Sequence, residues 1–218
     1  MKNISIKTDI EDEYVINTYE KIANAFSSTR PKTWDWIDKF YLSLPNKQSN
    51  ILDIGCGSGR NMNNLPNTNH LFTGIDTCKE FLKIAKSNTL NVILSDMCNL
   101  PFNYNTFDAM ISIASFHHLS NISRREQALQ SLYNVMKPDC KCLMSVWSIT
   151  QPKNSKNYNK FVYGDNYVPW KNKKGQNLGN RYYYIFQKEE LENLLILSGF
   201  IIEKWEWIYG NEVITFIK

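Results

Sequence analysis

The stretch Ile-Leu-Asp-Ile-Gly-Cys-Gly-Ser-Gly at residues 51–59 decides the fold of this chain. Its first half is a short apolar run, which is typical of a buried strand in a parallel sheet. Its second half has glycine at every other position, and glycine lets the backbone turn sharply and approach a ligand at a helix N-terminus. The stretch therefore predicts a buried strand that ends in a ligand-binding turn.

Similar apolar runs recur along the chain and alternate with segments of helical spacing. We expect further strands at residues 71–75, 91–94, 106–113, 142–146, 200–207 and 212–217. Strands that alternate with helices form parallel sheets, whereas the last two strands are joined by so few residues that they must be antiparallel. The predicted fold class is α/β: a doubly wound, mostly parallel seven-stranded sheet with a C-terminal antiparallel strand and N-terminal helices.

We expect a single domain over residues 1–218. Its parts are N-terminal helices that cover a pocket (1–45), a cofactor-binding core (46–150), a basic substrate-binding insertion (151–181), and a C-terminal helix with strands (182–218). The insertion carries a net charge of +6 in a chain of net +4, and we expect it to lack regular structure. Lysines with interleaved aromatic residues are typical of surfaces that bind unpaired RNA.

Local signals predict where three helices begin and where one of them ends. Thr33 is expected to cap the second N-terminal helix, and residues Thr77–Glu80 and Ser123–Glu126 have the spacing of capping boxes. Pro138 is expected to stop the helix that follows Ser123, because proline cannot continue a helix.

Several classes of protein are excluded by what the sequence lacks. The N-terminus has no apolar signal-peptide core, and no stretch is long enough to span a membrane. The five cysteines indicate free thiols in a reducing cytosol, and Cys140 and Cys142 lack the second ligand pair of a zinc site. No metal site is predicted. The expected location is the cytoplasm, with the nucleus as a second location.

Three acidic residues lie at the ends of successive predicted strands. Asp76 follows the glycine turn by about 20 residues, where a carboxylate can accept both hydroxyls of a ribose. Asp96 follows the next strand, where it can face an adenine amino group. Asp53 precedes the turn, where it would repel a pyrophosphate but suits a sulfonium or an ammonium. Because the glycine pattern also departs from the dinucleotide fingerprint, the sequence favours S-adenosylmethionine as the bound cofactor.

Several of these segments resemble class I S-adenosylmethionine-dependent methyltransferases. They are ILDIGCGSGR (51–60), GID (74–76), SDMCNLPF (95–102) and NTFDAMISI (105–113). The chain is also similar to a narrower family, the eukaryotic tRNA wobble-uridine carboxymethyl methyltransferases. The segments that carry this similarity are YEKIANAFSSTR (19–30), SIASFHHLSNISRREQAL (112–129), VW (146–147), VPW (168–170) and RYYYIF (181–186). Tyr184 in the last segment stands where the family pattern has histidine.

The resemblance implies a function and two partners. The chain would transfer a methyl group from S-adenosylmethionine to the carboxylate of 5-carboxymethyluridine at the wobble position, giving the methyl ester. Its partners would be the tRNA anticodon loop and a small zinc-binding activator subunit, with which it would form a heterodimer. Two alternatives stay open. One is a small-molecule carboxyl or quinone methyltransferase, and the other is a non-catalytic S-adenosylmethionine-binding scaffold.

The chemistry of the reaction suggests which residue types are needed. A carboxylate is already ionised at pH 7, so its methylation needs a cation that holds it rather than a general base. An arginine fork suits this task. Arg30 and Arg181 lie beside the pocket by resemblance, whereas Arg124 and Arg125 are read either as substrate contacts or as surface residues at the start of a helix. Which arginine holds the carboxylate stays open.

Two further residues have both a functional and a structural interpretation. His117 either donates a hydrogen bond to the substrate or caps a helix, and Trp147 either stacks on a base or fills the core. The catalytic residues that we expect are Arg30, His117, Arg124, Trp147 and Arg181. The cofactor-binding residues that we expect are Arg30, Asp53, Gly55, Gly57, Gly59, Asp76, Asp96, Met97 and Ala114.

Overall fold

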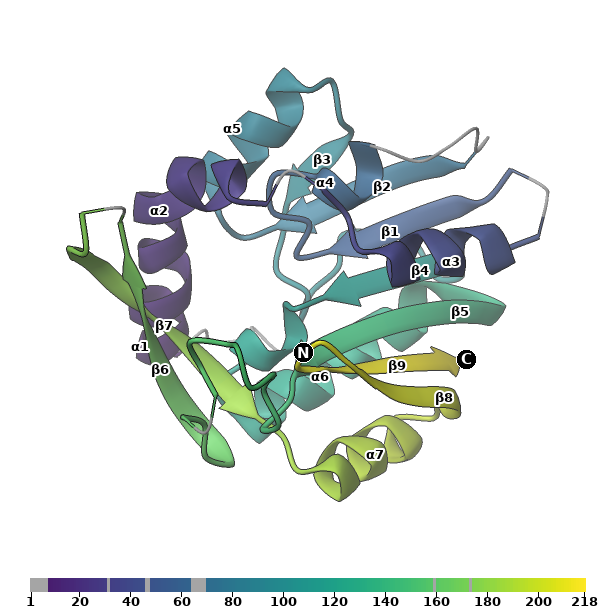
Figure 1. Ribbon diagram of the computed structural model, residues 1–218. Coiled ribbons are helices and arrows are strands. Elements are labelled where there is room, and N and C mark those ends of the chain that lie inside the picture. The colour runs from purple at the N-terminus through teal and green to yellow at the C-terminus, as the bar shows by residue number, and fades with distance from the viewer. Residues whose placement is uncertain (1–7, 31, 46–47, 64–69, 159, 173) are drawn as a thin grey trace.

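The strand that precedes the glycine turn lies in the middle of a seven-stranded sheet. β1 (Asn50–Ile54) pairs in parallel with β2 (Leu71–Asp76) on one side and with β4 (Phe107–Ile113) on the other. The other strands of this sheet are β3 (Val92–Leu94), β5 (Met136–Trp147), β8 (Ile201–Ile208) and β9 (Asn211–Ile217). Figure 1 shows the computed structural model, which describes residues 8–30, 32–45, 48–63, 70–158, 160–172 and 174–218.

The strand order is β3-β2-β1-β4-β5-β9-β8, and only β9 runs against its neighbours. The predicted α/β fold, with a mostly parallel seven-stranded sheet and a C-terminal antiparallel strand, is therefore confirmed. The helices are α1 (Asp9–Glu11), a π-helical turn (Asp12–Ile16), α2 (Asn17–Ser28), α3 (Asp35–Ser43), α4 (Arg60–Asn63), α5 (Lys79–Ser87), a 3-10 turn (Phe116–His118), α6 (Ile122–Val135) and α7 (Lys188–Leu197).

Successive residues of a strand point to opposite faces of a sheet. In this sheet the residues on both faces are buried, and helices cover each face. Leu52 and Ile54 of β1 lie in one buried cluster with residues of α6 and α7. Ile51, which directly precedes Leu52 in the strand, belongs to a second cluster with residues of α3. No helix among the described residues is both long and apolar enough to cross a bilayer.

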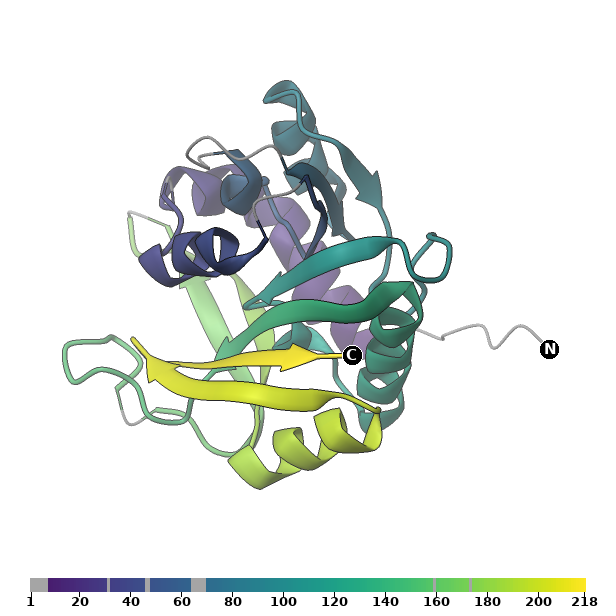
Figure 2. The same ribbon diagram turned by 90° about the vertical axis from the view of Figure 1, so that its right-hand side faces the viewer.

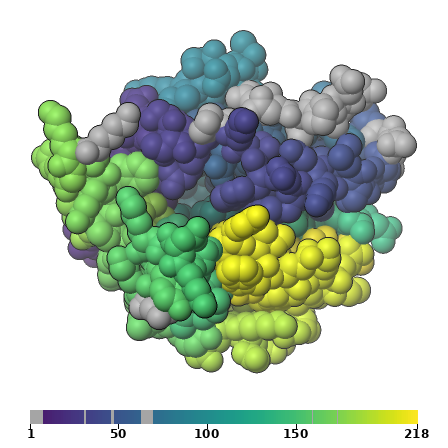
Figure 3. All heavy atoms as spheres, viewed as in Figure 1, coloured from purple at the N-terminus to yellow at the C-terminus, as the bar shows by residue number. Residues whose placement is uncertain are grey.

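A further layer lies over the carboxyl ends of the parallel strands (Figures 1 and 2). α2 packs between α5 and a two-stranded hairpin of β6 (Gly164–Lys171) and β7 (Asn177–Ile185). The hydroxyl of Thr18 in α2 donates to the carbonyl of Asn180 in β7 at 2.9 Å. In Figure 3 the N-terminal helices, the segment after β5 and the C-terminal hairpin surround a recess on this face.

The prediction that residues 151–181 lack regular structure is wrong for their second half. Gly164–Lys171 and Asn177–Ile185 are the paired strands of the β6–β7 hairpin, in which Val168, Tyr182 and Tyr183 are buried. The hairpin is ordered because its aromatic and β-branched residues pack against α2, and this packing partner lies more than a hundred residues away in the sequence.

The expected capping boxes are also wrong. α5 begins after Cys78, and its first amides, of Lys79 and Glu80, donate to the carboxylate of Glu20 in α2 at 2.7 and 3.2 Å. α6 begins two residues earlier than its predicted box, with the Asn121 side chain accepting from the amide of Arg124. In the first case a carboxylate from another helix replaces the local cap and also complements the helix dipole.

The remaining two boundary predictions fail for local reasons. α3 begins after Trp34 rather than Thr33, whose hydroxyl donates to the Asp38 carboxylate at 3.2 Å. α6 ends at Val135, so Pro138 lies inside β5 rather than at the helix end. The pairing of β4 with β5 is irregular along this stretch, and irregular ladders tolerate a residue that has no amide hydrogen.

Candidate active site

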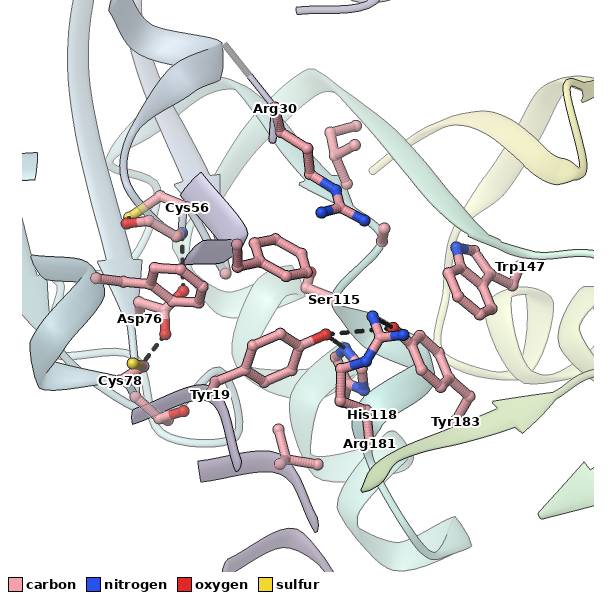
Figure 4. Close-up of a pocket in the computed structure, with 18 of the residues that line it drawn as sticks. Tyr19, Arg30, Cys56, Asp76, Cys78, Ser115, His118, Trp147, Arg181 and Tyr183 are labelled. Carbon is pink, nitrogen blue, oxygen red and sulfur yellow. Dashed lines mark hydrogen bonds between the residues drawn. The ribbon is translucent and has the colours of Figure 1, made fainter. Parts of the chain in front are cut away.

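A cavity of about 380 Å³ opens where the carboxyl ends of β1, β2, β4 and β5 meet α2 and the hairpin (Figure 4). Open α/β sheets place their ligands at this edge. Of the residues predicted from the sequence, Arg30, Gly55, Gly57, Asp76, Asp96, Met97, Ala114, Arg124, Trp147 and Arg181 line the cavity. The lining does not include Asp53, Gly59 or His117.

The glycine turn forms one wall of the cavity. Gly55 has φ +72°, and a Cβ there would lie 2.4 Å from the Cβ of Ser115, so only glycine fits. Gly57 has φ +55° and open space around it, and its amide donates to Asp76 at 2.8 Å. The turn therefore presents bare backbone to a ligand. Gly59, in contrast, faces the side chain of Leu90 and acts in packing.

Asp76 and Asp96 are fixed by backbone amides. Asp76 accepts from the amides of Gly57 and Cys78, each at 2.8 Å, and Asp96 accepts from the amide of Cys98 at 2.9 Å. Burial raises the pKa of Asp76 to about 6, although these amides oppose the shift. Each carboxylate oxygen has two lone pairs, so Asp76 can still accept hydroxyl donors from a ligand.

Asp53 lies beneath the turn rather than on the cavity surface. The residue is fully buried, and neither of its oxygens has a hydrogen-bond partner among the described residues. Burial raises the pKa of this carboxyl to about 7, and the nearby guanidinium of Arg60 opposes the shift. An unsatisfied buried carboxylate is costly, which makes Asp53 a candidate to hold a cationic group of a ligand.

Arg124 and Arg125 are not the surface residues that one interpretation of the sequence expected, since each is only 3% exposed. Arg124 pairs with Glu11 of α1 at 2.7 Å and with Asp96 at 2.8 Å. Arg125 lies over the ring of Tyr184 at 3.4 Å. The two carboxylate partners of Arg124 make it a group that positions Asp96.

Three other arginines line the cavity: Arg30, Arg60 and Arg181. Within the described parts of the chain, none of the three forms an ion pair with a carboxylate. Arg30 and Arg181 extend into the cavity from opposite walls in Figure 4, and both lie near the ring of Trp170, at 5.4 and 5.2 Å. Such a cluster of unpaired cations favours an anionic ligand.

A chain of hydrogen bonds runs from Arg181 into the interior, and each group in it donates to the next. Arg181 donates to the hydroxyl of Tyr183 at 2.6 Å, and this hydroxyl lies 3.3 Å from that of Tyr19. The ring of His118 bridges two groups. Its Nε2 lies 3.1 Å from the hydroxyl of Tyr19, and its Nδ1 lies 2.6 Å from the carbonyl oxygen of Tyr182. The carbonyl can only accept, so Nδ1 carries the proton and Nε2 accepts from Tyr19.

The chain of donors therefore runs from Arg181 through Tyr183 and Tyr19 to His118. Burial lowers the pKa of His118 to about 4, so the ring is neutral at physiological pH and the direction of the chain is fixed. Neither Tyr19 nor His118 was among the site residues predicted from the sequence. The one sequence signal for both was their place in the family segments, because their contact spans 99 residues.

His117 and Trp147 pack behind this chain. Nδ1 of His117 accepts from the amide of Trp147 at 3.0 Å, and burial lowers the pKa of His117 well below its usual value. Trp147 stacks on Tyr183 at 4.0 Å and on Phe161 at 5.4 Å. The Trp147 ring is therefore already engaged on Tyr183 and Phe161. Among the described residues, no group of three or more His, Cys, Asp or Glu side chains is arranged to hold a metal.

Comparisons with known proteins agree with this geometry. A family model described as a methyltransferase domain matches residues 52–144. A tRNA (carboxymethyluridine(34)-5-O)-methyltransferase of Schizosaccharomyces pombe is 35% identical, with 89% of this chain and 91% of that protein covered. Its counterpart in Arabidopsis thaliana is 37% identical, with 71% of this chain but only 38% of that protein covered.

Solved structures share the fold at low sequence identity. The 1,6-didemethyltoxoflavin-N1-methyltransferase of Burkholderia thailandensis, solved with S-adenosylhomocysteine, is 16% identical with a TM-score of 0.66, and 93% and 85% of the two chains are covered. A putative methyltransferase complex of Haloferax volcanii with the Trm112 activator contains a chain that is 12% identical with a TM-score of 0.64. Coverage in that case is 98% and 99%.

Proposed function

This chain belongs to the tRNA (carboxymethyluridine(34)-5-O)-methyltransferase family, and we propose that it methylates the carboxylate of 5-carboxymethyluridine at position 34 of a tRNA. The methyl donor is S-adenosylmethionine. The sulfonium S–CH3 bond breaks as an O–CH3 bond forms, and S-adenosylhomocysteine leaves as a neutral thioether. The charges of sulfonium and carboxylate cancel in the products, so the step moves no proton.

The observation that carries this proposal is the set of unpaired cations beside the acidic cradle. Asp76 and Asp96 suit a nucleoside, and Arg30, Arg60 and Arg181 suit carboxylates. The donor has one carboxylate in its methionine part, and the proposed substrate brings a second. A reaction between a cation and an anion needs both held in line with water excluded, and orientation supplies much of the rate.

We assign the substrate carboxylate to Arg181, with Arg30 facing it from the opposite wall. Arg181 is 4% exposed and is held by the Tyr183 hydroxyl, so its planar fork is oriented before substrate arrives. Its Nε is buried and has no hydrogen-bond partner among the described residues, which leaves a donor for a carboxylate oxygen.

The donor is assigned to the opposite half of the cavity. Asp76 would accept from the ribose hydroxyls, Asp96 and the amide of Met97 would face the adenine, and Gly55, Gly57 and Ala114 would contact the donor through their backbone. Asp53, buried beneath the turn, would favour the ammonium of the methionine part through its charge rather than by contact. Arg60 or Arg30 would pair with its carboxylate.

His117 and Trp147 act through their neighbours in this proposal. His117 receives the amide of Trp147, and Trp147 supports the Tyr183 ring that holds Arg181. Arg124 keeps Asp96 in place. These are positioning roles, whereas Arg181 contacts the reacting group.

Mass spectrometry of tRNA nucleosides from cells with and without the gene tests the reaction and the substrate together. Loss of the gene should remove the methyl ester and leave free carboxymethyluridine. An unchanged ester level would contradict the proposal. If the purified chain methylates small carboxylic acids or quinones but no tRNA, it is a small-molecule methyltransferase, and donor binding without any turnover would identify a scaffold.

A small zinc-binding activator subunit is the second proposed partner. β3 is an edge strand of the sheet, and Leu94 at its end is 51% exposed, as is Leu71 of β2 at 56%. Co-expression with the activator should give a stable heterodimer, and Leu94→Glu should dissociate it.

We also propose that the protein acts in the cytoplasm, with the nucleus as a second location. Fluorescence microscopy of the tagged chain tests this location.

A further inference from the structure

Tyr209 is an exposed tyrosine at the rim of the cavity. It lies in the two-residue turn between β8 and β9 and is 79% exposed, yet it belongs to the cavity lining together with Gln151, Ser155 and Asn157. The other aromatic side chains of the lining each contact another ring. Among the described residues, Tyr209 takes part in no ring pair and no cation–π contact.

The backbone of Tyr209 is held in a conformation that tyrosine rarely adopts. Its φ is +48° and that of Gly210 is +81°, the pattern of a type I′ turn. Such turns strongly prefer Asn-Gly, because asparagine tolerates positive φ better than an aromatic residue does. Strained backbone of this kind tends to occur where a side chain serves a ligand.

The turn is also fixed in place. The amide of Ser148 and the side chain of Gln151 both donate to the carbonyl of Gly210, at 2.9 and 2.7 Å. The hairpin tip is thereby joined to the segment after β5, beside which it lies in Figure 2. That segment contributes the exposed lysines Lys153 and Lys156. A solvent-facing ring on a fixed turn, joined to a segment that carries exposed lysines, suits an unpaired base that is attached to phosphate.

We propose that Tyr209 stacks on a nucleobase adjacent to the one that enters the cavity. This inference rests on the proposed function, since it assigns the ring to the same RNA substrate. The modified uridine would occupy the cavity, and the ring would hold its neighbour at the rim. Trp147 is not available for this contact, because its ring already stacks on Tyr183 and Phe161.

The test measures binding of a fluorescent anticodon stem-loop RNA to the full chain by anisotropy. Tyr209→Ala should weaken binding about 5- to 150-fold, the range expected for loss of one base stack. Tyr209→Phe keeps the ring and should bind within about twofold of the unmodified chain. Tyr104→Ala is the matched control, because Tyr104 is 75% exposed but precedes β4 at the opposite edge of the sheet, and it should change nothing.

Tyr209→Asn separates a functional ring from a structural one. Asparagine relieves the positive-φ strain, so the melting temperature should rise by about 2–4 °C while RNA binding weakens as in the alanine variant. Methylation of free 5-carboxymethyluridine nucleoside should be unchanged in Tyr209→Ala. The inference would be overturned if RNA binding were unchanged in both variants. It would also be overturned if Tyr209→Ala lowered methylation of the free nucleoside as much as it weakened RNA binding. A wild-type chain that binds the stem-loop through Tyr209 but methylates no tRNA would overturn the proposed function alone.

Discussion

The two halves of the cavity are built in different ways. The donor half consists of a glycine turn and strand-end carboxylates that backbone amides hold, and these residues lie within 45 positions of one another in the sequence. The substrate half consists of side chains from α2, the 3-10 turn, β5 and β7, which touch through contacts up to 164 residues apart. The donor half is thus fixed by local backbone, and the substrate half depends on tertiary packing.

The largest expected effect lies in the substrate half, at Arg181. Arg181→Gln should lower kcat/KM for tRNA by about 30- to 5000-fold, because truncating one partner of a buried charge pair costs about 2–5 kcal/mol. Affinity for S-adenosylhomocysteine, measured by calorimetry, should stay unchanged. Arg181→Lys retains the charge without the fork and should fall in between. A glutamine variant that retains a third of the activity would place the carboxylate elsewhere.

The next effect lies in the donor half, at Asp76. Asp76→Asn should weaken S-adenosylhomocysteine binding about 10- to 150-fold, since hydrogen bonds to charged groups contribute about 1.5–3 kcal/mol. Stem-loop RNA binding without donor should not change. Asp139→Asn, an exposed acid near the start of β5, serves as the control. Equal donor affinity in the Asp76 variant and the control would remove the ribose assignment.

The pH dependence of donor affinity sharpens the same contrast. The ionised form of Asp76 accepts two hydroxyls, and its pKa is about 6 in the free chain, so affinity should fall by up to tenfold per unit as the pH drops below 6. Folding stability should respond with the opposite sign. A carboxyl whose folded pKa exceeds its unfolded value contributes more stability as the pH falls from about 6 toward 4. Calorimetry at pH 5 and pH 7.5 checks the first trend, which Asp76→Asn should reduce to the part that Asp53, with a pKa of about 7, contributes.

The smallest expected effect concerns the hydrogen-bond chain behind Arg181. Tyr19→Phe removes the link from Tyr183 to His118 and should lower kcat about 2- to 10-fold, because a buried hydrogen bond contributes about 0.5–1.5 kcal/mol. KM for the donor should stay the same. Tyr133→Phe, half-buried against the core beside Phe200, is the matched control. A variant that lowers stability but leaves kcat intact would give Tyr19 a packing role only.

The same contrast explains what the sequence could predict. The sheet, the glycine turn and Asp76 depend on local patterns, so apolar runs and spacing suffice to find them. The burial of Arg124 was missed because Glu11, its ion-pair partner, lies 113 residues away. The cap of α5 was missed because Glu20 lies 59 residues away from Lys79. Partners this far away in the sequence cannot be recognised from a short segment of it.

The contacts of Glu20 have a consequence for turnover. α2 is attached to α5 through Glu20 and to β7 through Thr18, and its own side chains form one wall of the cavity. Spent donor cannot leave past α2 unless these contacts open. On a route past α2, the rate at which these contacts open would set an upper limit on turnover.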